Sequence, residues 1–411
     1  MRKHSDPVVV LGGSLTGLGV LRTFGRRGID AYLVTDRKEP AVFSKYCKRS
    51  FNVSGKRFDR EILKKLLKRI GRMLGRRIVV YPTTDLDALN LAEIKDDLAE
   101  DFHFVVGDKA PVETLVNKSK FYKALDRSGI DHPMTCFPEG MKDVQRIAVD
   151  ISYPVFVRPA ITQIMSQNLR TSAKGFIAHS PKELLQYFHL ASTHRVEVMF
   201  QEIIPGPPDN SCQLEGYYNK NSRPVALFAR QRLRIWPPDF GNTTLCVSMP
   251  MRELTDEKTV INKFLHQIGY HGLMSTEFKK DSRDGRQKIL EINARPWWHI
   301  WLSSKCGVDI VFLSYLDAMG EKIDYKEEYE IGVKSMYFLN DLLASVSMFR
   351  DGSLRFDEWF RSLRGVKQFA FFSSDDMSPF VMEFADRARL STFQGVLHSL
   401  REKARFSAHS S

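Results

Sequence analysis

Short apolar runs alternate with segments of helical spacing over the first part of the chain. Val8–Leu11 and Ala31–Thr35 are two such runs, and residues 78–81 form a third. A glycine-rich turn and an amphipathic segment separate the first two runs. When crossover helices cover both faces of a set of strands, those strands usually form a parallel sheet. The pattern therefore predicts a parallel sheet of Rossmann type over roughly the first 110 residues.

A different pattern, typical of a β-hairpin, occurs in the second half of the chain. Residues 273–279 and 287–293 predict two strands, and an Asp-Gly turn lies between them. Folding the chain symmetrically about Asp284 places Glu277 opposite Glu291. Like charges directly opposite each other destabilise a sheet. The pair is therefore best explained by a cation that binds between the two carboxylates.

The strand that carries Glu291 also carries Asn293 and Arg295 on the same face, because side chains alternate along a strand. Two carboxylates and an amide carbonyl are hard oxygen ligands, which suit Mg²⁺ bound to phosphates. Glu277, Glu291 and Asn293 are therefore the candidate metal ligands. The alternative is that both glutamates are ordinary solvated strand residues. The apolar neighbours and the shared face favour the metal site.

A basic helix accounts for much of the formal net charge of +12. Between Lys45 and Arg77, thirteen Lys and Arg residues face only Asp59 and Glu61. Apolar residues follow helical spacing within this stretch, so the cations lie on the outer face of an amphipathic helix. A solvated surface helix is the favoured interpretation, and attraction to an anionic acceptor or an acidic membrane surface is the alternative. No aromatic pattern or motif for sequence-specific nucleic-acid binding accompanies these charges.

The composition is that of a folded protein with several domains. The chain has 411 residues, of which 43% are hydrophobic and 27% charged. No apolar run reaches the ~18 residues needed to cross a bilayer, and the N-terminus lacks the features of a signal peptide. The five cysteines have no short spacing, which argues against a zinc site or a disulfide framework. A cytoplasmic protein is expected.

The glycines after the first strand have two interpretations. Gly13, Gly17 and Gly19 have the spacing of dinucleotide-binding loops, and Asp36 lies about twenty residues further on. However, the chain lacks the Tyr-x-x-x-Lys pair that dehydrogenases with this spacing need. The glycines then serve close packing of helix and strand, or bind a substrate carboxylate. An NAD(P)-binding oxidoreductase stays open as an alternative function.

A series of short motifs follows in a fixed order along the chain. The motifs are Asn117-Lys118 before a helix, Gly129-Ile-x-x-Pro133, Tyr153-Pro-Val-Phe-Val-Arg158-Pro159, Lys174-Gly175, Gln201-Glu-Ile-Ile-Pro-Gly206 and Glu291-Ile-Asn-Ala-Arg295. Over about residues 1–320 this series resembles the ATP-grasp superfamily of carboxylate–amine ligases, and the C-terminal part is similar to uncharacterised carboligases and D-aspartate ligase-like members. Each motif alone is modest, but their common order and spacing are specific.

The resemblance implies a set of nucleotide-binding residues. Lys118, Arg158 and Lys174 would contact phosphates, Glu202, Ile203 and Ile204 would form the adenine hinge, and Asp209 would bind the ribose. Two features depart from the family. Arg158 replaces the usual lysine, although it keeps the charge and adds a planar fork. Residues 161–172 contain no glycine, where many members carry a glycine-rich flap.

The resemblance also implies an α/β and α+β fold of several domains. Residues 1–112 would be a Rossmann-like pre-grasp domain, 113–205 the small and 206–320 the large ATP-grasp subdomain. Residues 321–411 are expected to form a helical C-terminal extension whose polar tail is disordered.

The predicted function is a ligase that forms carbon–nitrogen bonds with ATP and Mg²⁺, or Mn²⁺ in its place. A carboxylate becomes an acyl phosphate, and an amine then displaces phosphate to give an amide. Arg295 would stabilise the transferring phosphoryl group, and Arg232 and Arg234 would anchor the acceptor carboxylate or the acyl phosphate. Gln231, Arg232 and Arg234 fit a solvated strand face equally well.

The substrates of such a ligase are a small-molecule carboxylate and an amine, which the sequence does not identify. The basic helix slightly favours an anionic acceptor. A homodimer is compatible with the sequence. Besides the oxidoreductase, the other alternative is a non-catalytic ATP-binding protein.

Overall fold

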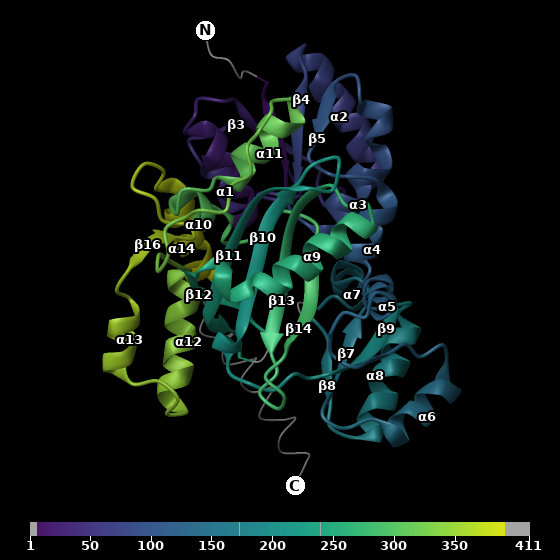
Figure 1. The fold of residues 1–411 in the computed structure, drawn as a ribbon. Coiled ribbons are helices and arrows are strands. Elements are labelled where there is room, and N and C mark those ends of the chain that lie inside the picture. The colour runs from purple at the N-terminus through teal and green to yellow at the C-terminus, as the bar shows by residue number, and fades with distance from the viewer. Residues whose placement is uncertain (1–5, 172, 239, 391–411) are drawn as a thin grey trace.

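Three β-sheets, each with its own helices, make up the computed structural model of the chain, which describes residues 6–171, 173–238 and 240–390. Figure 1 shows the N-terminal sheet at the top, a small sheet at the lower right, and the long strands of the third sheet through the middle. The first sheet is parallel and the other two are largely antiparallel. A mixed α/β fold with several domains is therefore confirmed.

The N-terminal sheet is parallel and covered on both faces. Its elements are β1 (Val8–Leu11), α1 (Leu15–Gly25), β2 (Ala31–Thr35), β3 (Cys47–Asn52), α2 (Arg60–Leu74), β4 (Ile78–Pro82), α3 (Asp85–Ile94), β5 (Phe102–Phe104) and α4 (Lys109–Val116), with short 3-10 turns at Pro40–Phe43 and Asp96–Leu98. The strand order is β3-β2-β1-β4-β5. Val8 and Val10 pack in a core with α1, whereas Val9 and Leu11 pack in a core with α2. Burial on both faces explains why these strands are apolar at every position.

The glycine loop after β1 allows α1 to start against the strand. A Cβ atom added at Gly17 would lie 2.0 Å from the carbonyl oxygen of Gly12, so only glycine permits this contact. The amide of Gly13 donates to the carboxylate of Glu39 at 2.7 Å. Asp36 accepts from a backbone amide at 2.8 Å. These residues thus have partners within the chain, and close packing explains the glycine spacing.

Helix α2 has the amphipathic pattern that the sequence predicts. The side chain of Asp59 caps its N-terminus by accepting from the amide of Ile62 at 3.0 Å. Leu63 and Leu67 are buried on its inner face, and Lys64 pairs with Asp97 on the surface. Across the ranges named above, the structure contains no helix that is both long enough and apolar enough to span a bilayer.

The small sheet is antiparallel, and one of its faces packs in an apolar core. Its elements are β6 (Thr135–Cys136), α6 (Met141–Asp150), β7 (Val155–Pro159), α7 (Thr162–Leu169), β8 (Phe176–Ala178), α8 (Pro181–Thr193) and β9 (Val198–Glu202), preceded by α5 (Lys118–Ser128). The strand order is β6-β9-β7-β8. Val155, Val157 and Phe200 pack in one core with α6 and α8. Phe156 and Arg158 alternate with these residues and point to the other face.

The third sheet has seven strands, and α9 covers one of its faces. Its elements are the 3-10 turn Pro208–Asn210, β10 (Ser211–Tyr218), β11 (Pro224–Trp236), β12 (Asn242–Ser248), the 3-10 turn Met251–Leu254, α9 (Thr255–Gln267), β13 (Gly272–Lys280), β14 (Gln287–Asn293), β15 (Lys334–Met336) and β16 (Val366–Phe369). The order is β14-β13-β10-β11-β12-β15-β16. Leu214 and Phe278 pack in one core with Ile261 and Phe264 of α9, which crosses in front of these strands in Figure 1.

The C-terminal part is not purely helical, so the prediction of a helical extension for 321–411 is wrong in this respect. Beyond α10 (Ile300–Lys305) and α11 (Ile310–Ala318) it contains α12 (Phe338–Arg350), α13 (Phe356–Ser362) and α14 (Ser378–Leu390), but also β15 and β16. Leu245 of β12 pairs with Met336 of β15. Without this pairing the edge of β12 would expose unpaired backbone groups. The tail predicted to be disordered falls mostly in residues 391–411, which lie outside the described residues.

Candidate active site

The hairpin of β13 and β14 places Glu277 directly opposite Glu291, as the sequence predicts. The predicted symmetry fails nearer the turn, where the pairing shifts by one residue and leaves Leu290 as an extra residue on β14. Such a β-bulge frees backbone groups from the ladder. The carbonyl oxygen of Leu290 accepts hydrogen bonds from the Tyr122 hydroxyl and, at 3.2 Å, from the Arg158 guanidinium. The bulge therefore joins the hairpin to the small sheet and to α5.

One face of the seven-stranded sheet is polar across four neighbouring strands. The register places Glu291, Glu277, Gln213 and Arg230 side by side on β14, β13, β10 and β11. Since neighbouring strands lie about 4.8 Å apart, this row spans roughly 15 Å. The other face packs against α9. The polar face is the floor of the candidate site.

A cavity of about 820 Å³ lies over this floor. Its walls come from all three sheets, for example from Asp85 at the start of α3, Phe156 of β7 and Trp297 after β14. Most of the predicted site residues line it, namely Lys118, Arg158, Lys174, Glu202, Ile203, Ile204, Arg232, Glu277, Glu291, Asn293 and Arg295. The fold thus gathers residues that are far apart in the sequence around one space.

Arg158 is the most highly connected of these side chains. Its guanidinium donates to Glu291 at 2.6 Å, to the Tyr122 hydroxyl at 2.9 Å and to the Gln201 side chain at 3.0 Å. It also reaches the Leu290 carbonyl. A lysine has only three donors on one nitrogen, whereas the arginine fork serves four acceptors. The departure from the family's lysine is therefore accommodated by acceptors that the fold places around the fork.

The charges around Glu291 keep its carboxylate ionised. Burial raises the pKa of Glu291, but the charges of Lys118, Arg158 and Lys174 outweigh this effect and hold the pKa below its usual range. Burial lowers the pKa of Lys118, and the Arg158 charge lowers it further. Partial desolvation lowers the pKa of Lys174, against the opposing effect of Glu291, although this side chain is exposed and donates to Asn242 at 2.9 Å. Three cations thus surround one carboxylate, an excess of positive charge that favours a polyanionic ligand.

Arginines hold the other acidic and amide groups of the floor. Arg232 pairs with Glu277 at 2.9 Å. Arg295 donates to the Asn293 side-chain oxygen at 2.8 Å and to Asp85 at 2.8 Å. Because Asp85 begins α3, this last pair connects the N-terminal domain directly to the floor. Arg295 is thereby fixed from two domains.

The oxygen ligands of Glu277, Glu291 and Asn293 fit a magnesium ion. They lie on neighbouring strands, and the Asn293 amide donates to Glu291 at 3.2 Å. Among the described residues there is no group of three or more His, Cys, Asp or Glu side chains placed to bind a metal. Mg²⁺ commonly uses one or two carboxylates and completes its shell with water and substrate phosphates. The two carboxylates and the amide oxygen satisfy this requirement.

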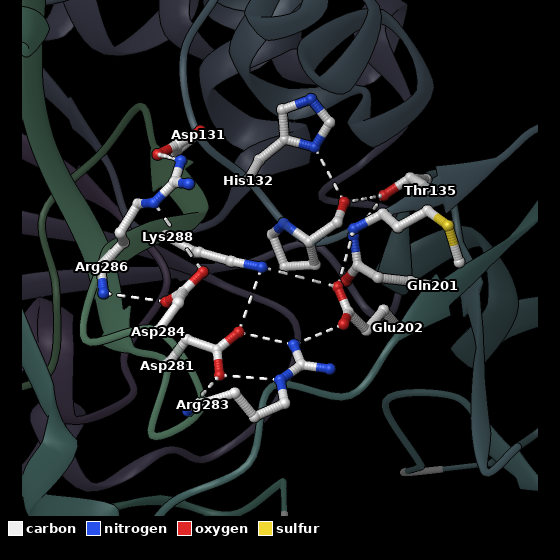
Figure 2. A network of polar contacts seen from close by, with 12 residues as sticks. Asp131, His132, Thr135, Gln201, Glu202, Asp281, Arg283, Asp284, Arg286 and Lys288 are labelled. Atoms are coloured by element: carbon white, nitrogen blue, oxygen red, sulfur yellow. Dashed lines mark hydrogen bonds and ion pairs between the residues drawn. The ribbon is translucent and has the colours of Figure 1, made fainter. Parts of the chain in front are cut away.

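The Glu202 side chain belongs to a polar network that joins β9 to the turn of the β13–β14 hairpin (Figure 2). Its carboxylate accepts from Arg283 and from the amide of Met134, and Lys288 lies 3.8 Å away. Asp281 holds the same Arg283 from the hairpin side. The side chain of Glu202 is therefore committed to this network, and its backbone amide donates to the carbonyl of Met134 at 2.9 Å. Ile203 and Ile204 follow it along the cavity wall.

Two of the predicted residues lie apart from the cavity. Arg234 forms a buried pair with Asp341 of α12 at 2.8 Å and also donates to Ser362. Asp209 is exposed, and its carbonyl accepts from Gln231 at 2.9 Å. Neither Arg234 nor Asp209 lines the cavity. β11 contains a bulge between Arg232 and Arg234, and the two side chains have different partners: Arg232 pairs with Glu277 and Arg234 with Asp341.

The segment after Arg158 forms a helix in place of an extended flap. Thr162 and Gln163, in the first turn of α7, line the cavity. Asn168 donates instead to the carbonyl of His194 at 2.9 Å. The cavity is therefore lined here by side chains at the start of α7 and not by glycine backbone.

Sequence analysis missed Asp85, Gln213, Glu215 and Arg230. Asp85 had a usable signal, because it follows a parallel strand at the edge where ligands bind such sheets. Gln213 and Glu215 alternate with apolar residues in β10, which is buried throughout its length. Such alternation is also typical of a solvated strand face, so sequence alone does not reveal that these residues are buried.

Comparisons with known proteins agree with this geometry. No protein-family model matches the chain. The D-aspartate ligase of Enterococcus faecium (strain Aus0004) is 24% identical over 302 residues, which cover 70% of each chain. The carbamoyl phosphate synthase large chain of Saccharolobus islandicus (strain M.14.25 / Kamchatka #1) is 22% identical over 226 residues. That match covers 53% of this chain but only 20% of the synthase chain.

Solved structures share the fold at low identity. The biotin carboxylase domain of Hydrogenobacter thermophilus 2-oxoglutarate carboxylase, solved as a dimer with MgADP, ADP and bicarbonate, has a TM-score of 0.62 at 16% identity, covering 80% of this chain and 74% of that one. N5-carboxyaminoimidazole synthetase from Staphylococcus aureus has a TM-score of 0.60 at 15% identity, with 80% and 82% covered. L-amino acid ligase from Bacillus licheniformis has a TM-score of 0.59 at 14% identity, covering 77% of this chain and 75% of that one. The resemblance to ATP-grasp carboxylate–amine ligases is thus confirmed.

Proposed function

We propose that this protein is an ATP-grasp ligase that uses ATP and Mg²⁺ to join a carboxylate to an amine. The observation that carries the proposal is a single cavity in which a facing pair of carboxylates meets a group of cations. The pair is Glu277 and Glu291, and the cations are Lys118, Arg158, Lys174, Arg232 and Arg295. Phosphoryl transfer needs this combination, because positioning and charge neutralisation supply nearly all of the catalysis.

The triphosphate would bind between the small sheet and the floor. Lys118, Arg158 and Lys174 would contact its phosphates, and the buried position of Lys118 strengthens its attraction for an anion. The segment from Glu202 to Ile204 would hold the adenine through the side chains of Ile203 and Ile204 and through backbone groups other than the Glu202 amide, which donates to Met134. Asp209 would bind the ribose only after its exposed side chain turns toward the cavity.

Glu277, Glu291 and Asn293 would hold Mg²⁺. When bound, the ion neutralises negative charge on the phosphates and aligns them for transfer. Arg158 and Arg232 neutralise the two carboxylates in the structure. Both arginines are therefore placed to move from a carboxylate to a phosphate when the nucleotide and the ion bind.

In the proposed reaction, a substrate carboxylate oxygen attacks the γ-phosphorus, and the bond from that phosphorus to the bridging oxygen of ADP breaks. The amine nitrogen then attacks the acyl carbon, phosphate leaves with the former carboxylate oxygen, and the nitrogen loses a proton. Arg295 would stabilise the charge on the transferring group, and Arg232 would hold the acyl phosphate. Arg234 takes no part in this proposal, because Asp341 and Ser362 hold it elsewhere.

The proposed domain division is a Rossmann-like pre-grasp domain (1–112), two ATP-grasp subdomains (113–205 and 206–320) and a C-terminal segment (321–411). Its support is that each of the first three ranges holds one sheet, and that the fourth lends β15 and β16 to the third sheet. A homodimer and a cytoplasmic location complete the proposal. The alternative of an oxidoreductase is disfavoured, because the glycine loop amide of Gly13 already binds Glu39.

The experiment is to measure ADP release with pools of carboxylic acids and amines, with and without Mg²⁺. A ligase releases ADP only when Mg²⁺, a carboxylate and an amine are all present. An ¹⁸O-labelled carboxylate of an active pair should transfer one label to the released phosphate, because the acyl phosphate forms through that oxygen. ATP binding without ADP release under any pairing would support a non-catalytic nucleotide-binding protein instead.

A further inference from the structure

Helix α12 exposes a stripe of large apolar side chains. Its exposed apolar residues are Phe338, Leu342 and Val346, which are spaced four residues apart. Side chains at this spacing lie on one side of a helix. The other side of α12, which includes Ala344, is buried and packs against β11 and β12. The stripe therefore points away from the protein core.

Helix α13 continues the exposed apolar surface at one end of this stripe. None of the seven residues of α13, all of which the structure describes, is buried. Phe356 and Phe360 of α13 are 68% and 60% exposed. The ring of Phe356 lies 6.2 Å from that of Phe349 near the end of α12, and Figure 1 shows the two helices together at the lower left edge of the molecule. Two more phenylalanines thus lie beside the stripe in contact with solvent.

Helix α14 adds a further phenylalanine at the other end of the stripe. The Tyr337 hydroxyl, at the start of α12, donates to Glu383 of α14 at 2.6 Å. The next residue of α14, Phe384, is 57% exposed. Among the described residues, all five phenylalanines with exposed side chains lie between residues 338 and 384. The C-terminal apolar face consists of Phe338, Leu342, Val346, Phe356, Phe360 and Phe384.

The C-terminal apolar face is large enough for a stable protein–protein contact. Its side chains are 38–68% exposed. Because a fully exposed phenylalanine presents about 200 Å², and leucine and valine somewhat less, the face exposes roughly 600 Å². The largest apolar patch on a typical monomer covers about 300–600 Å², and larger patches mark interaction sites. One side of a standard interface buries about 800 Å², of which a little over half is apolar. The face therefore supplies the apolar area that one side of such an interface needs.

The charge around this face indicates which kind of partner covers it. The whole chain has a formal net charge of +12, but residues 338–390 contain seven Lys and Arg against eight Asp and Glu. Charged neighbours of the face pair with each other, as Arg361 does with Asp357 at 2.6 Å and Arg387 with Glu383 at 2.7 Å. An anionic membrane or polymer is attracted to a cationic surface such as that of α2, and not to this one. Two copies of the chain, in contrast, meet here without the repulsion that their net charge causes elsewhere.

We propose that the C-terminal apolar face is the interface through which two copies of this chain form a homodimer. A two-fold axis at the middle of the stripe pairs Leu342 with Leu342 of the partner subunit. The same axis sets Phe338 opposite Val346 of the partner subunit, so a large side chain meets a small one in both halves of the contact. The proposal assigns an interface to the homodimer of the proposed function, and it does not depend on the ligase chemistry.

Sedimentation velocity of the full chain over a range of micromolar concentrations tests the proposal. We expect the parent chain to form a dimer in a concentration-dependent manner. Leu342→Lys and Phe360→Lys each place a charge on the face and should each weaken dimerisation by about tenfold or more. Both positions are exposed on helices, where lysine is well tolerated, so an unchanged circular dichroism spectrum is expected. Val149→Lys is the matched control, because Val149 is 81% exposed on α6, and it should leave the dimer unchanged.

A mixture of oppositely charged variants tests the position of the two-fold axis. Leu342→Lys subunits repel each other at the axis, and Leu342→Glu subunits do so as well. An equimolar mixture of the two variants should recover the dimer, because each lysine then faces a glutamate of the partner subunit. A mixture that stays as monomeric as the separate variants would overturn the pairing of Leu342 with its own copy.

Two outcomes of the sedimentation experiment would overturn the interface. A parent chain that stays monomeric contradicts both the homodimer and its interface. A dimer that Leu342→Lys and Phe360→Lys weaken no more than Val149→Lys uses another surface. Flotation of a monomeric chain with phosphatidylcholine vesicles would assign the face to a lipid surface, and cross-links from residues 391–411 to α12 in a monomer would assign it to the end of the chain. ADP release is measured separately, so failure of the interface and failure of the ligase function are distinguishable.

Discussion

Glu277 and Glu291 lie directly opposite each other on β13 and β14, yet each carboxylate is paired with a different arginine. Arg158 reaches Glu291 from the small sheet, and Arg232 reaches Glu277 from β11. The repulsion expected between facing carboxylates is therefore relieved without an ion. Binding of Mg²⁺ and a triphosphate would replace these pairs and release both arginines toward the phosphates.

Replacing Glu291 by Gln should abolish Mg²⁺-dependent turnover and leave the fold intact. The amide is a weaker ligand than the carboxylate, and it also leaves Arg158 without its ion pair. We expect ADP release to fall by about 100-fold or more, with an unchanged circular dichroism spectrum. Glu100→Gln, on the exposed surface, serves as the control. Parental activity in Glu291→Gln would remove this residue from the site.

Replacing Arg158 by lysine should impair ATP binding less than replacing it by an uncharged residue. Lysine keeps the positive charge but loses the fork that serves Tyr122, Gln201 and Glu291 together. We expect the KM for ATP to rise about tenfold in Arg158→Lys and about 100-fold in Arg158→Met. Steady-state kinetics over a range of ATP concentrations measures both. Equal effects of the two substitutions would show that charge at this position does not contact the nucleotide.

Arg234 should prove structural rather than catalytic. It forms a pair with Asp341 that is 4% and 2% exposed, so removing one partner leaves a buried charge. Arg234→Met should lower the free energy of unfolding by about 3–5 kcal/mol. The double variant Arg234→Met/Asp341→Leu should recover most of that loss. Denaturant unfolding gives the stabilities, and an unchanged kcat in the folded double variant would exclude a catalytic role.

Asp85 should act as a positioning residue for Arg295. Asp85, at the start of α3, accepts from Nε of Arg295 at 2.8 Å, and Asn293 accepts from Nη2 of the same guanidinium at 2.8 Å. Asp85→Asn keeps the size but weakens the charged hydrogen bond, so Arg295 becomes less well placed. We expect kcat to fall about tenfold with little change in the KM for ATP. A rise in the KM for ATP at constant kcat would instead indicate direct contact with the nucleotide.

Acidification should destabilise the protein partly through His271. Burial lowers the pKa of His271 to about 4, and the charges of Lys220 and Lys95 act in the same direction. Because the fold favours the neutral ring, this contribution to stability is complete above the unfolded pKa of about 6.5 and is lost as pH falls from there toward 4.

The variant His271→Gln isolates this effect. Between pH 7.5 and pH 5, the free energy of unfolding of the parent should fall by about 2 kcal/mol more than that of the variant. Urea unfolding at both pH values measures the difference. Parallel pH profiles for parent and variant would show that His271 is not held neutral.

Much of the predicted site could be derived from patterns within short segments of the sequence. Ile289 and Ile292 both pack in the core although two residues lie between them, which breaks the alternation of a regular strand. The bulge at Leu290 resolves this conflict and also restores the pairing of Glu277 with Glu291. The spacing of Ile289 and Ile292 was visible in the sequence, but a symmetric pairing about Asp284 does not include the bulge that this spacing implies. The pairing of Glu277 with Glu291 was predicted correctly because the strand register departs from symmetry only between the bulge and the turn.

Side-chain partners from distant segments could not be predicted in the same way. Glu202 lies at the expected hinge, but its carboxylate binds Arg283, from the far hairpin turn. Arg234 has the same spacing as Arg232, but a bulge and helix α12 place it in a buried pair. Gln213 has the alternation of an exposed strand residue and is buried. Each outcome depends on which element packs over the strand, and residue periodicity does not contain that information.

The amino-acid sequence therefore established the apolar strands of the first sheet, the facing carboxylates of the hairpin and the order of the motifs that resemble the ATP-grasp superfamily. These features depend on alternation, turn chemistry and spacing within short segments. The folded chain established that β15 and β16 extend the large sheet, that Asp85 holds Arg295, and that Gln213, Glu215 and Arg230 form a buried polar group. These features depend on contacts between segments far apart in the chain, where burial and charge pairing are properties of the packed surfaces together.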